Sequence, residues 1–352
     1  MNHIEQVFDC SQLAELSIEC NPFPADNVLS FVAKLNTVYA KYPRMRYSFG
    51  IQSFDNGVLA QAGRPYTFPG MVDFLRSLQP LKQEHNIFNL DFIAFGKFNQ
   101  TKKGHSQLWT PSALQFFSSL ANAQFADSFS LYTLELFEHQ KWKIAEKAVL
   151  RQQGCLGTEE EVDAEFQLLK ALLLDAGYVR YEISNFSLIS RSSIHNRVYR
   201  EMENYLGLGL YASSFLRGDS VYFSPWKEKM QPLFPSLETN ETYTGVRFTN
   251  TPYLPKYLTG ERISAETVQW LSPMDMLIET FFLAIRTDRG IEDSTPFIPV
   301  LVADYEQKLH AYAQEGYLTF KSISPTSKNG FRLTDKGMDC ANALITELLA
   351  QV

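Results

Sequence analysis

Apolar residues along the first 180 positions follow the periods of alternating helices and strands. In residues 26–42, Val28, Val32 and Leu35 are three or four positions apart, which is the spacing of one helix face. Residues 87–94 form a short, nearly continuous apolar run, as is typical of a strand that is buried on both faces. The pattern therefore predicts a buried sheet with helices packed against it.

This alternation repeats along the chain. Strands are expected at residues 16–20, 46–51, 87–94, 128–134 and 178–183, and helices at 26–42, 68–85, 111–122 and 159–176. Single helices between strands imply right-handed crossovers and a parallel sheet. Ligands bind such sheets at the carboxyl ends of the strands. Four polar residues are expected near those ends: Glu19, Gln52, Asp91 and His195.

Residues 177–215 contain a dense group of polar residues after a strand. A Ser/Arg-rich loop leads to His195 and Asn196, and Gly207 and Gly209 follow. A loop histidine can bind a metal or haem iron or transfer protons, and glycines allow close approach of the backbone. The alternative is that the histidine is a surface or capping residue and the Gly-x-Gly pair a turn. The residues alone do not decide between these interpretations.

The C-terminal part has a different character. Residues 222–258 are rich in aromatic residues and proline. Ser272 is a predicted N-cap with Pro273 at the first helical position. Further helices and a short hairpin complete a small, mostly helical domain that is similar to a winged helix. We expect an α/β part over residues 1–220, a connection over 221–265 and the helical domain over 266–352.

Composition restricts the class of protein. The chain has 352 residues, of which 45% are hydrophobic, so it can form a sizeable core. Its net charge of −7 is unfavourable for nucleic-acid binding, which usually needs a basic surface. No apolar run is long enough to span a membrane, and no signal-peptide pattern is present at the start. The expected location is the cytoplasm.

The four cysteines are far apart in the sequence: Cys10, Cys20, Cys155 and Cys340. Because none is in a CxxC or CxxxCxxC arrangement, neither a disulfide framework nor a local metal knuckle is expected.

Several motifs resemble one known family. The stretch YEISNF at 181–186, the HNxxY arrangement of His195, Asn196 and Tyr199, and YLGLG at 205–209 resemble HemW-type haem chaperones. These proteins are relatives of the oxygen-independent coproporphyrinogen III oxidases of the radical SAM family. Weaker similarities occur elsewhere along the chain: IECNP at 18–22, FGIQSFD at 49–55, GR at 63–64, NLD at 89–91 with QT at 100–101, RFTNT at 247–251 and RTDRGI at 286–291.

The resemblance implies an incomplete parallel (β/α) barrel of the radical SAM type and a set of ligand-binding residues. The residues that match the S-adenosylmethionine site are Glu19, Gln52, Arg64, Asp91 and Ser213, with Ser213 standing where the family has a histidine. Carboxylates can accept hydrogen bonds from ribose hydroxyls or from the amino group of the methionine. Arg64 could bind the carboxylate of the methionine part through two hydrogen bonds. Without the resemblance, a polar residue at a strand end is better interpreted as a helix cap.

The chain departs from the family in its cluster-binding segment. A radical SAM protein uses a CxxxCxxC loop to bind a 4Fe-4S cluster and a GGGTP turn to approach S-adenosylmethionine, and neither motif occurs here. We expect the first two strand–helix units to be absent, leaving residues 16–20 as an unpaired edge strand. Arg200 also replaces the tryptophan that usually follows HNxxY. The chain is not expected to be catalytic alone.

The resemblance therefore implies a protein that binds haem and transfers it to an acceptor protein. His195 is the candidate iron ligand, and Asn196 and Tyr199 flank it. S-adenosylmethionine binding is expected to be weak. Three alternatives stay open: a fragment of a complete radical SAM enzyme, a non-functional remnant, and a half-enzyme to which another polypeptide supplies the missing strands.

Overall fold

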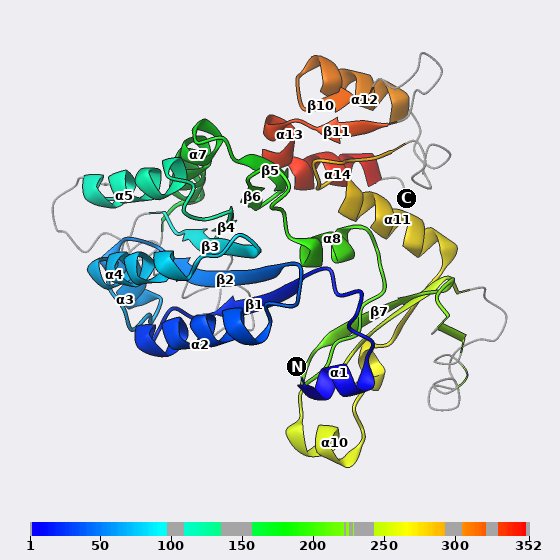
Figure 1. Cartoon of the computed structure of the whole chain (residues 1–352). Coiled ribbons are helices and arrows are strands. Elements are labelled where there is room, and N and C mark those ends of the chain that lie inside the picture. The colour runs from blue at the N-terminus through cyan, green and yellow to red at the C-terminus, as the bar shows by residue number, and fades with distance from the viewer. Residues whose placement is uncertain are drawn as a thin grey trace. The chain divides into compact units, whose positions relative to one another are not determined.

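The computed structural model describes residues 2–96, 109–134, 157–221, 223–224, 228, 243–292, 305–321 and 330–349. The chain forms two compact units, residues 1–194 and 195–352. Each unit is described by itself, and Figure 1 shows the elements of both. The three-part division expected from the sequence, with boundaries at 220 and 265, stays a prediction.

The first unit is built on a six-stranded sheet with the order β1-β2-β3-β4-β6-β5. Its strands are β1 (Leu16–Cys20), β2 (Met45–Gln52), β3 (Asn86–Ala94), β4 (Ser128–Thr133), β5 (Val179–Glu182) and β6 (Asn185–Ser187). Strands β1 to β4 are parallel, as predicted. The single strand expected at 178–183 is instead the start of an antiparallel hairpin, because only two residues join β5 to β6.

Helices cover one face of this sheet (Figure 1). They are α2 (Ala25–Val38), α3 (Asn56–Gln61), α4 (Phe68–Leu78), α5 (Pro111–Asn122) and α7 (Glu159–Asp175), with α1 (Asn2–Val7) and the short 3-10 helix η1 (Gln79–Leu81) outside this set. Threonine side chains cap the starts of α4, α5 and α7. Helix α4 ends earlier than predicted because Pro80 has no N–H to continue it.

The core of the first unit lies between the sheet and these helices, and aromatic side chains dominate it. Phe49 and Phe88 come from neighbouring strands and contact each other edge to face, with ring centroids 5.6 Å apart. Phe92 packs in the same way on Phe117 of α5 at 5.2 Å. All four side chains are almost completely buried. Edge-to-face pairs of this kind add to the stability that burial alone provides.

A buried carboxylate joins α7 to the segments on either side of residues 97–108. Glu165 accepts hydrogen bonds from the backbone N–H groups of Phe95 (2.9 Å) and Gly96 (2.8 Å) and from the indole N–H of Trp109 (2.6 Å). Its side chain is only 2% exposed. One side chain of α7 thus fixes the end of β3 and the start of α5.

The second unit contains a three-stranded antiparallel sheet, a two-stranded sheet and six helices among its described residues. The strands are β7 (Ser213–Arg217), β8 (Gly245–Thr249) and β9 (Gln269–Leu271), and β10 (Leu318–Phe320) with β11 (Phe331–Leu333). The helices are α8 (Ile194–Arg200), α10 (Leu254–Thr259), α11 (Pro273–Ala284), α12 (Tyr305–Gln314), α13 (Asp335–Asp339) and α14 (Ala341–Leu349), besides the 3-10 turn η3 (Ala265–Thr267).

The predicted start of α11 is confirmed. Ser272 accepts a hydrogen bond from the N–H of Asp275 (3.2 Å), and Asp275 accepts one from the N–H of Ser272 (2.9 Å). Pro273 occupies the first turn, as expected. The sequence did not predict the sheet β7-β8-β9. No helix within the described ranges has both the length and the apolar character needed to cross a membrane.

Candidate functional site

The face of the first sheet opposite the helices is polar. Because side chains alternate along a strand, every second residue of β1 to β4 lies on this face. Its polar members are Glu19 on β1, Arg46, Ser48 and Gln52 on β2, Asn89 and Asp91 on β3, and Ser128 and Ser130 on β4, while Gly50, Ile87, Ile93 and Tyr132 share the same face. The strand register places Glu19 opposite Ser48, Ser48 opposite Asn89, and Asp91 opposite Ser130.

Asp91 lies at the centre of this face and is held by hydrogen bonds. The hydroxyl of Ser48 donates to its Oδ2 at 2.7 Å, and the amide of Asn89 donates to its Oδ1 at 2.6 Å. Despite these bonds, burial raises the pKa of Asp91 above its ordinary value. The structure therefore favours a carboxyl group that retains its proton to a higher pH than usual.

Two further charged groups act on Asp91. Glu19 is exposed on the edge strand, yet partial burial of its carboxyl group and repulsion from Asp91 raise the pKa of Glu19. Arg46 is 5% exposed, donates to the hydroxyl of Ser128 (3.0 Å), and its positive charge opposes both shifts. The structure thus brings two predicted residues, Glu19 and Asp91, into one electrostatic cluster with Arg46.

Gln52 has a strained backbone at the carboxyl end of β2. Its φ is 69°, in the left-handed region that side-chain-bearing residues rarely adopt, and a bulge between Gly50 and Gln52 shifts the register with β3. The Gln52 amide folds back over Gly50, where an added Cβ would lie 2.6 Å from its nitrogen. Such strain often occurs at ligand sites.

Arg64 belongs to the loop beside this strand end. The hydroxyl of Tyr66 donates to the carbonyl oxygen of Gly50 at 2.8 Å, which fixes the loop against β2. The Nε of Arg64 is buried and has no hydrogen-bond partner. A buried donor without an acceptor is costly, so this group suits an anionic ligand.

These residues fit S-adenosylmethionine better than they fit an iron–sulfur cluster. The carboxyl groups of Glu19 and Asp91 can accept hydrogen bonds from the amino group or the hydroxyls of this ligand. The Nε of Arg64 can donate to its carboxylate. Among the described residues, no three His, Cys, Asp or Glu side chains gather into a possible metal site. Cys20 is buried, which raises the pKa of its thiol to about 12. The residues Gln100, Thr101 and Cys155 lie outside the described ranges.

The predicted haem-binding residues lie on α8 rather than on a loop. His195 and Tyr199 are one helical turn apart, and their rings meet edge to face with centroids 4.8 Å apart. Tyr199 contacts Tyr205 at 4.6 Å, and Tyr205 contacts Phe215 of β7 at 6.0 Å. Burial and the neighbouring Tyr205 raise the pKa of Tyr199. His195 is the exposed end of this aromatic column, and Asn196 adjoins it on the helix.

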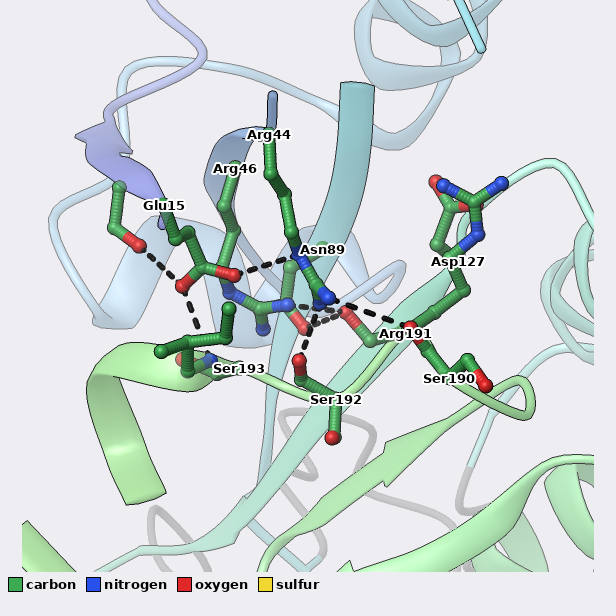
Figure 2. A network of polar contacts seen from close by, with 12 residues as sticks. Glu15, Arg44, Arg46, Asn89, Asp127, Ser190, Arg191, Ser192 and Ser193 are labelled. Carbon is green, nitrogen blue, oxygen red and sulfur yellow. Dashed lines mark hydrogen bonds and ion pairs between the residues drawn. The ribbon is translucent and has the colours of Figure 1, made fainter. Parts of the chain in front are cut away.

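The Ser/Arg-rich segment before α8 has a structural explanation. Figure 2 shows it against the amino ends of the strands of the first sheet. Arg44, just before β2, donates to the carbonyl oxygens of Ser190 (3.3 Å) and Ser192, and forms an ion pair with Glu15 at 2.8 Å. Glu15 also accepts a hydrogen bond from the N–H of Ile194 (3.2 Å). The density of polar residues here reflects these internal contacts.

A second ion pair holds the same segment. Asp127, just before β4, lies 3.8 Å from the Arg191 guanidinium and 3.2 Å from the Lys82 ammonium. Its backbone carbonyl accepts from the N–H of Leu188 at 2.9 Å. Residues 188–194 are therefore attached at both Glu15 and Asp127.

The two glycines after α8 serve the fold of the second unit. A Cβ on Gly207 would lie 2.3 Å from the carbonyl oxygen of Ser213, so only glycine allows this backbone packing. Gly209 has a φ of 105°, and the amide of Asn250 donates to the carbonyl oxygens of both glycines. Ser213 is exposed at the start of β7, with its hydroxyl 3.2 Å from that of Thr249. The role assigned to Ser213 by resemblance stays a prediction.

Sequence reasoning missed Arg46, Asn89 and Ser130. A signal was available, because polar residues occupy alternate positions in strands that otherwise read as apolar, as in Arg46-Tyr-Ser48 and Asn89-Leu-Asp91.

The sheet and its polar inner face define the class of fold. No protein-family model matches the chain. The solved structure of the radical SAM enzyme coproporphyrinogen III oxidase (HemN) from Escherichia coli is similar, with a TM-score of 0.59 and 16% sequence identity over 94% of this chain and 69% of that one. The predicted α/β fold with a parallel sheet is confirmed by this similarity.

Haem chaperones named HemW are similar to the chain in sequence. HemW of Lactococcus lactis is 25% identical over 98% of this chain and 78% of its own length. HemW of Synechocystis and of Bacillus subtilis are 26% and 27% identical over 82% and 66% of this chain. The chain spans only 60% and 58% of the lengths of these two relatives. The resemblance to HemW-type haem chaperones is confirmed.

Proposed function

We propose that this protein binds haem through His195 and transfers it to an acceptor protein. The observation that carries the proposal is the position of His195: it is an exposed imidazole at the end of the column formed with Tyr199, Tyr205 and Phe215. The similarity to proteins named haem chaperones supports it.

The column gives the imidazole a defined environment. The ring of Tyr199 contacts the His195 ring edge to face, which restricts rotation of the imidazole. Tyr205 in turn contacts the ring of Tyr199. An imidazole nitrogen is a common axial ligand of haem iron. A ligand that is exposed rather than enclosed can exchange with a ligand from another protein, as transfer requires.

A haem titration followed by visible absorption tests this proposal. We expect His195→Ala to weaken haem binding at least tenfold and to change the Soret band. The matched control is His310→Ala, because His310 is also exposed, belongs to the same unit and contacts an aromatic ring, that of Phe320 at 5.1 Å. If both variants give the spectrum and affinity of the unaltered protein, His195 is not the ligand.

A second candidate activity is S-adenosylmethionine binding on the polar face of the first sheet. Asp91, Glu19 and the unpaired Nε of Arg64 are the observations that favour it. When bound in a radical SAM protein, this group supplies a radical with the help of an iron–sulfur cluster. Among the described residues, no group of three His, Cys, Asp or Glu side chains could hold such a cluster.

Isothermal titration with S-adenosylmethionine measures this binding directly. We expect weak binding that Arg64→Gln reduces at least threefold, because the carboxylate of S-adenosylmethionine would lose its guanidinium partner. The control is Arg76→Gln, since Arg76 is exposed on α4 and 73% of its side chain is accessible. Equal affinity of the two variants would exclude Arg64 from the site.

A further inference from the structure

The second unit contains a pocket that the haem proposal does not use, although Arg197 of the HNxxY motif and Arg289 of RTDRGI line it. Its volume is about 450 Å³, within the usual range of ligand sites. The wall is formed by α8 and the turn after it, the end of β7, α11 and the residues that follow α11. All of its lining residues belong to this one unit.

The floor of the pocket is apolar. Met202 is 4% exposed and lies directly after α8, while Met276, Leu277 and Ala284 come from one side of α11. Methionine side chains are flexible and polarisable, so they adapt to flat or irregular apolar ligands. The pocket can therefore bind a body larger than a simple inorganic ion.

Arginines outnumber carboxylates in the lining, although the whole chain has a net charge of −7. Four arginines line the pocket: Arg197, Arg200, Arg217 and Arg289. Two carboxylates, Glu201 and Glu292, also line it, and Glu201 forms an ion pair with Arg289.

The arginines have acidic partners but retain donors. Arg197 lies 3.4 Å from Asp288, and Arg217 binds Asp219 through two bonds of 2.9 and 2.7 Å. A guanidinium has five N–H groups, and one carboxylate uses at most two of them at a time. Each paired arginine can therefore donate to a ligand without losing its partner.

The nearby helix start does not provide a phosphate site. Pro273 at the start of α11 lines the pocket. The backbone N–H of Asp275 already donates to the Ser272 hydroxyl, and that of Ser272 donates to the Asp275 carboxylate. An anionic ligand in this pocket must therefore be recognised by the arginine side chains. Guanidinium groups around an apolar floor suit carboxylates attached to an apolar body.

We propose that this pocket binds the carboxylate-bearing edge of an amphipathic organic dicarboxylate. If the proposed haem function holds, on which this assignment of the ligand rests, the ligand is the propionate edge of a tetrapyrrole. His195 and Arg197 are two positions apart and so lie on nearly opposite sides of α8. A tetrapyrrole bound here is therefore a separate molecule from one whose iron is bound by His195, and binding here needs no iron.

Metal-free protoporphyrin IX and its dimethyl ester, titrated in the same detergent and followed by fluorescence, test the proposal. We expect the diacid to bind the full chain at least tenfold more tightly than the diester. Arg200→Gln and Arg217→Gln should each weaken the diacid about tenfold, because a charged hydrogen bond is lost. Arg262→Gln is the control, since Arg262 is exposed in the same unit and does not line the pocket.

The outcomes separate this proposal from the haem proposal. His195→Ala should leave binding of the metal-free diacid unchanged. Equal affinities for diacid and diester, or no effect of the two pocket variants, would overturn the pocket assignment even if haem still binds through His195. A third outcome is that the arginine variants weaken diacid binding while His195→Ala leaves haem binding unchanged. That result would support the pocket proposal and overturn the assignment of His195 as the iron ligand. If neither haem nor porphyrin binds, both proposals fail.

Discussion

At the scale of single residues, Glu165 shows how burial changes the chemistry of a side chain. Burial is the largest influence on this group and raises the pKa of Glu165 to about 7, although three N–H donors favour the charged carboxylate. In the unfolded chain the same group titrates near pH 4.5. Folding therefore takes up a proton at this site between those two values.

This difference predicts a pH-dependent stability. Because the folded pKa is raised, the contribution of Glu165 is fully present below about pH 4.5 and is lost as the pH rises towards 7. The loss is roughly 3 kcal/mol over that range. We expect Glu165→Gln to remove this part of the pH dependence, as measured by urea unfolding from pH 4.5 to 7.5.

The matched control is Asp175→Asn, an exposed acid at the end of the same helix. It should leave the slope of stability against pH unchanged. A Glu165→Gln protein with the same slope as the unaltered protein would contradict the prediction.

Residue roles that depend on near neighbours could be predicted from the sequence. Ser272 was recognised as a helix cap because its partner is only three positions away. Glu165 and Arg46 were not recognised, because Glu165 binds groups 56 to 70 positions away and Arg46 binds Ser128, 82 positions away. Such contacts exist only after the sheet has formed.

At the scale of elements, the segment before α8 shows that polar density has more than one cause. The sequence suggested a ligand beside these residues, whereas the structure attaches residues 188–194 to the strand starts (Figure 2). The side chain of Glu15 is 2% exposed and that of Arg44 19%. The charge of this pair is therefore only partly screened by water.

Breaking this pair should destabilise the first unit. We expect Arg44→Met to lower the free energy of unfolding by about 3 kcal/mol, because the Glu15 carboxylate stays buried without its partner. Replacing both residues, as Glu15→Gln with Arg44→Met, should restore part of the loss. Chemical unfolding of the three proteins measures this.

An exposed ion pair provides the comparison. Arg76 and Asp73 on α4 are 73% and 79% exposed, so Arg76→Met should change stability by less than about 0.5 kcal/mol. Equal effects of the Arg44 and Arg76 substitutions would show that burial of the first pair has no energetic importance.

At the scale of the whole molecule, the regular part of the fold follows from periodicity. The four parallel strands and the helices α2, α4, α5 and α7 were predicted because each has a continuous pattern of its own, whereas the six-residue helix α3 was not. The sheet β7-β8-β9 was not, since its strands have three to five residues and β7 and β8 are separated by 27 positions. For the candidate site, the sequence supplied Glu19 and Asp91 through family resemblance, but not the Arg46 charge between them.

The bonds of Glu165 to Phe95, Gly96 and Trp109 also link the behaviour of two elements. One carboxylate of α7 holds both the residues that follow β3 and the residue two positions before α5. A connection made through one side chain is lost in a single event when that side chain is altered. Chemical damage to Glu165 would therefore release the end of β3 and the start of α5 together.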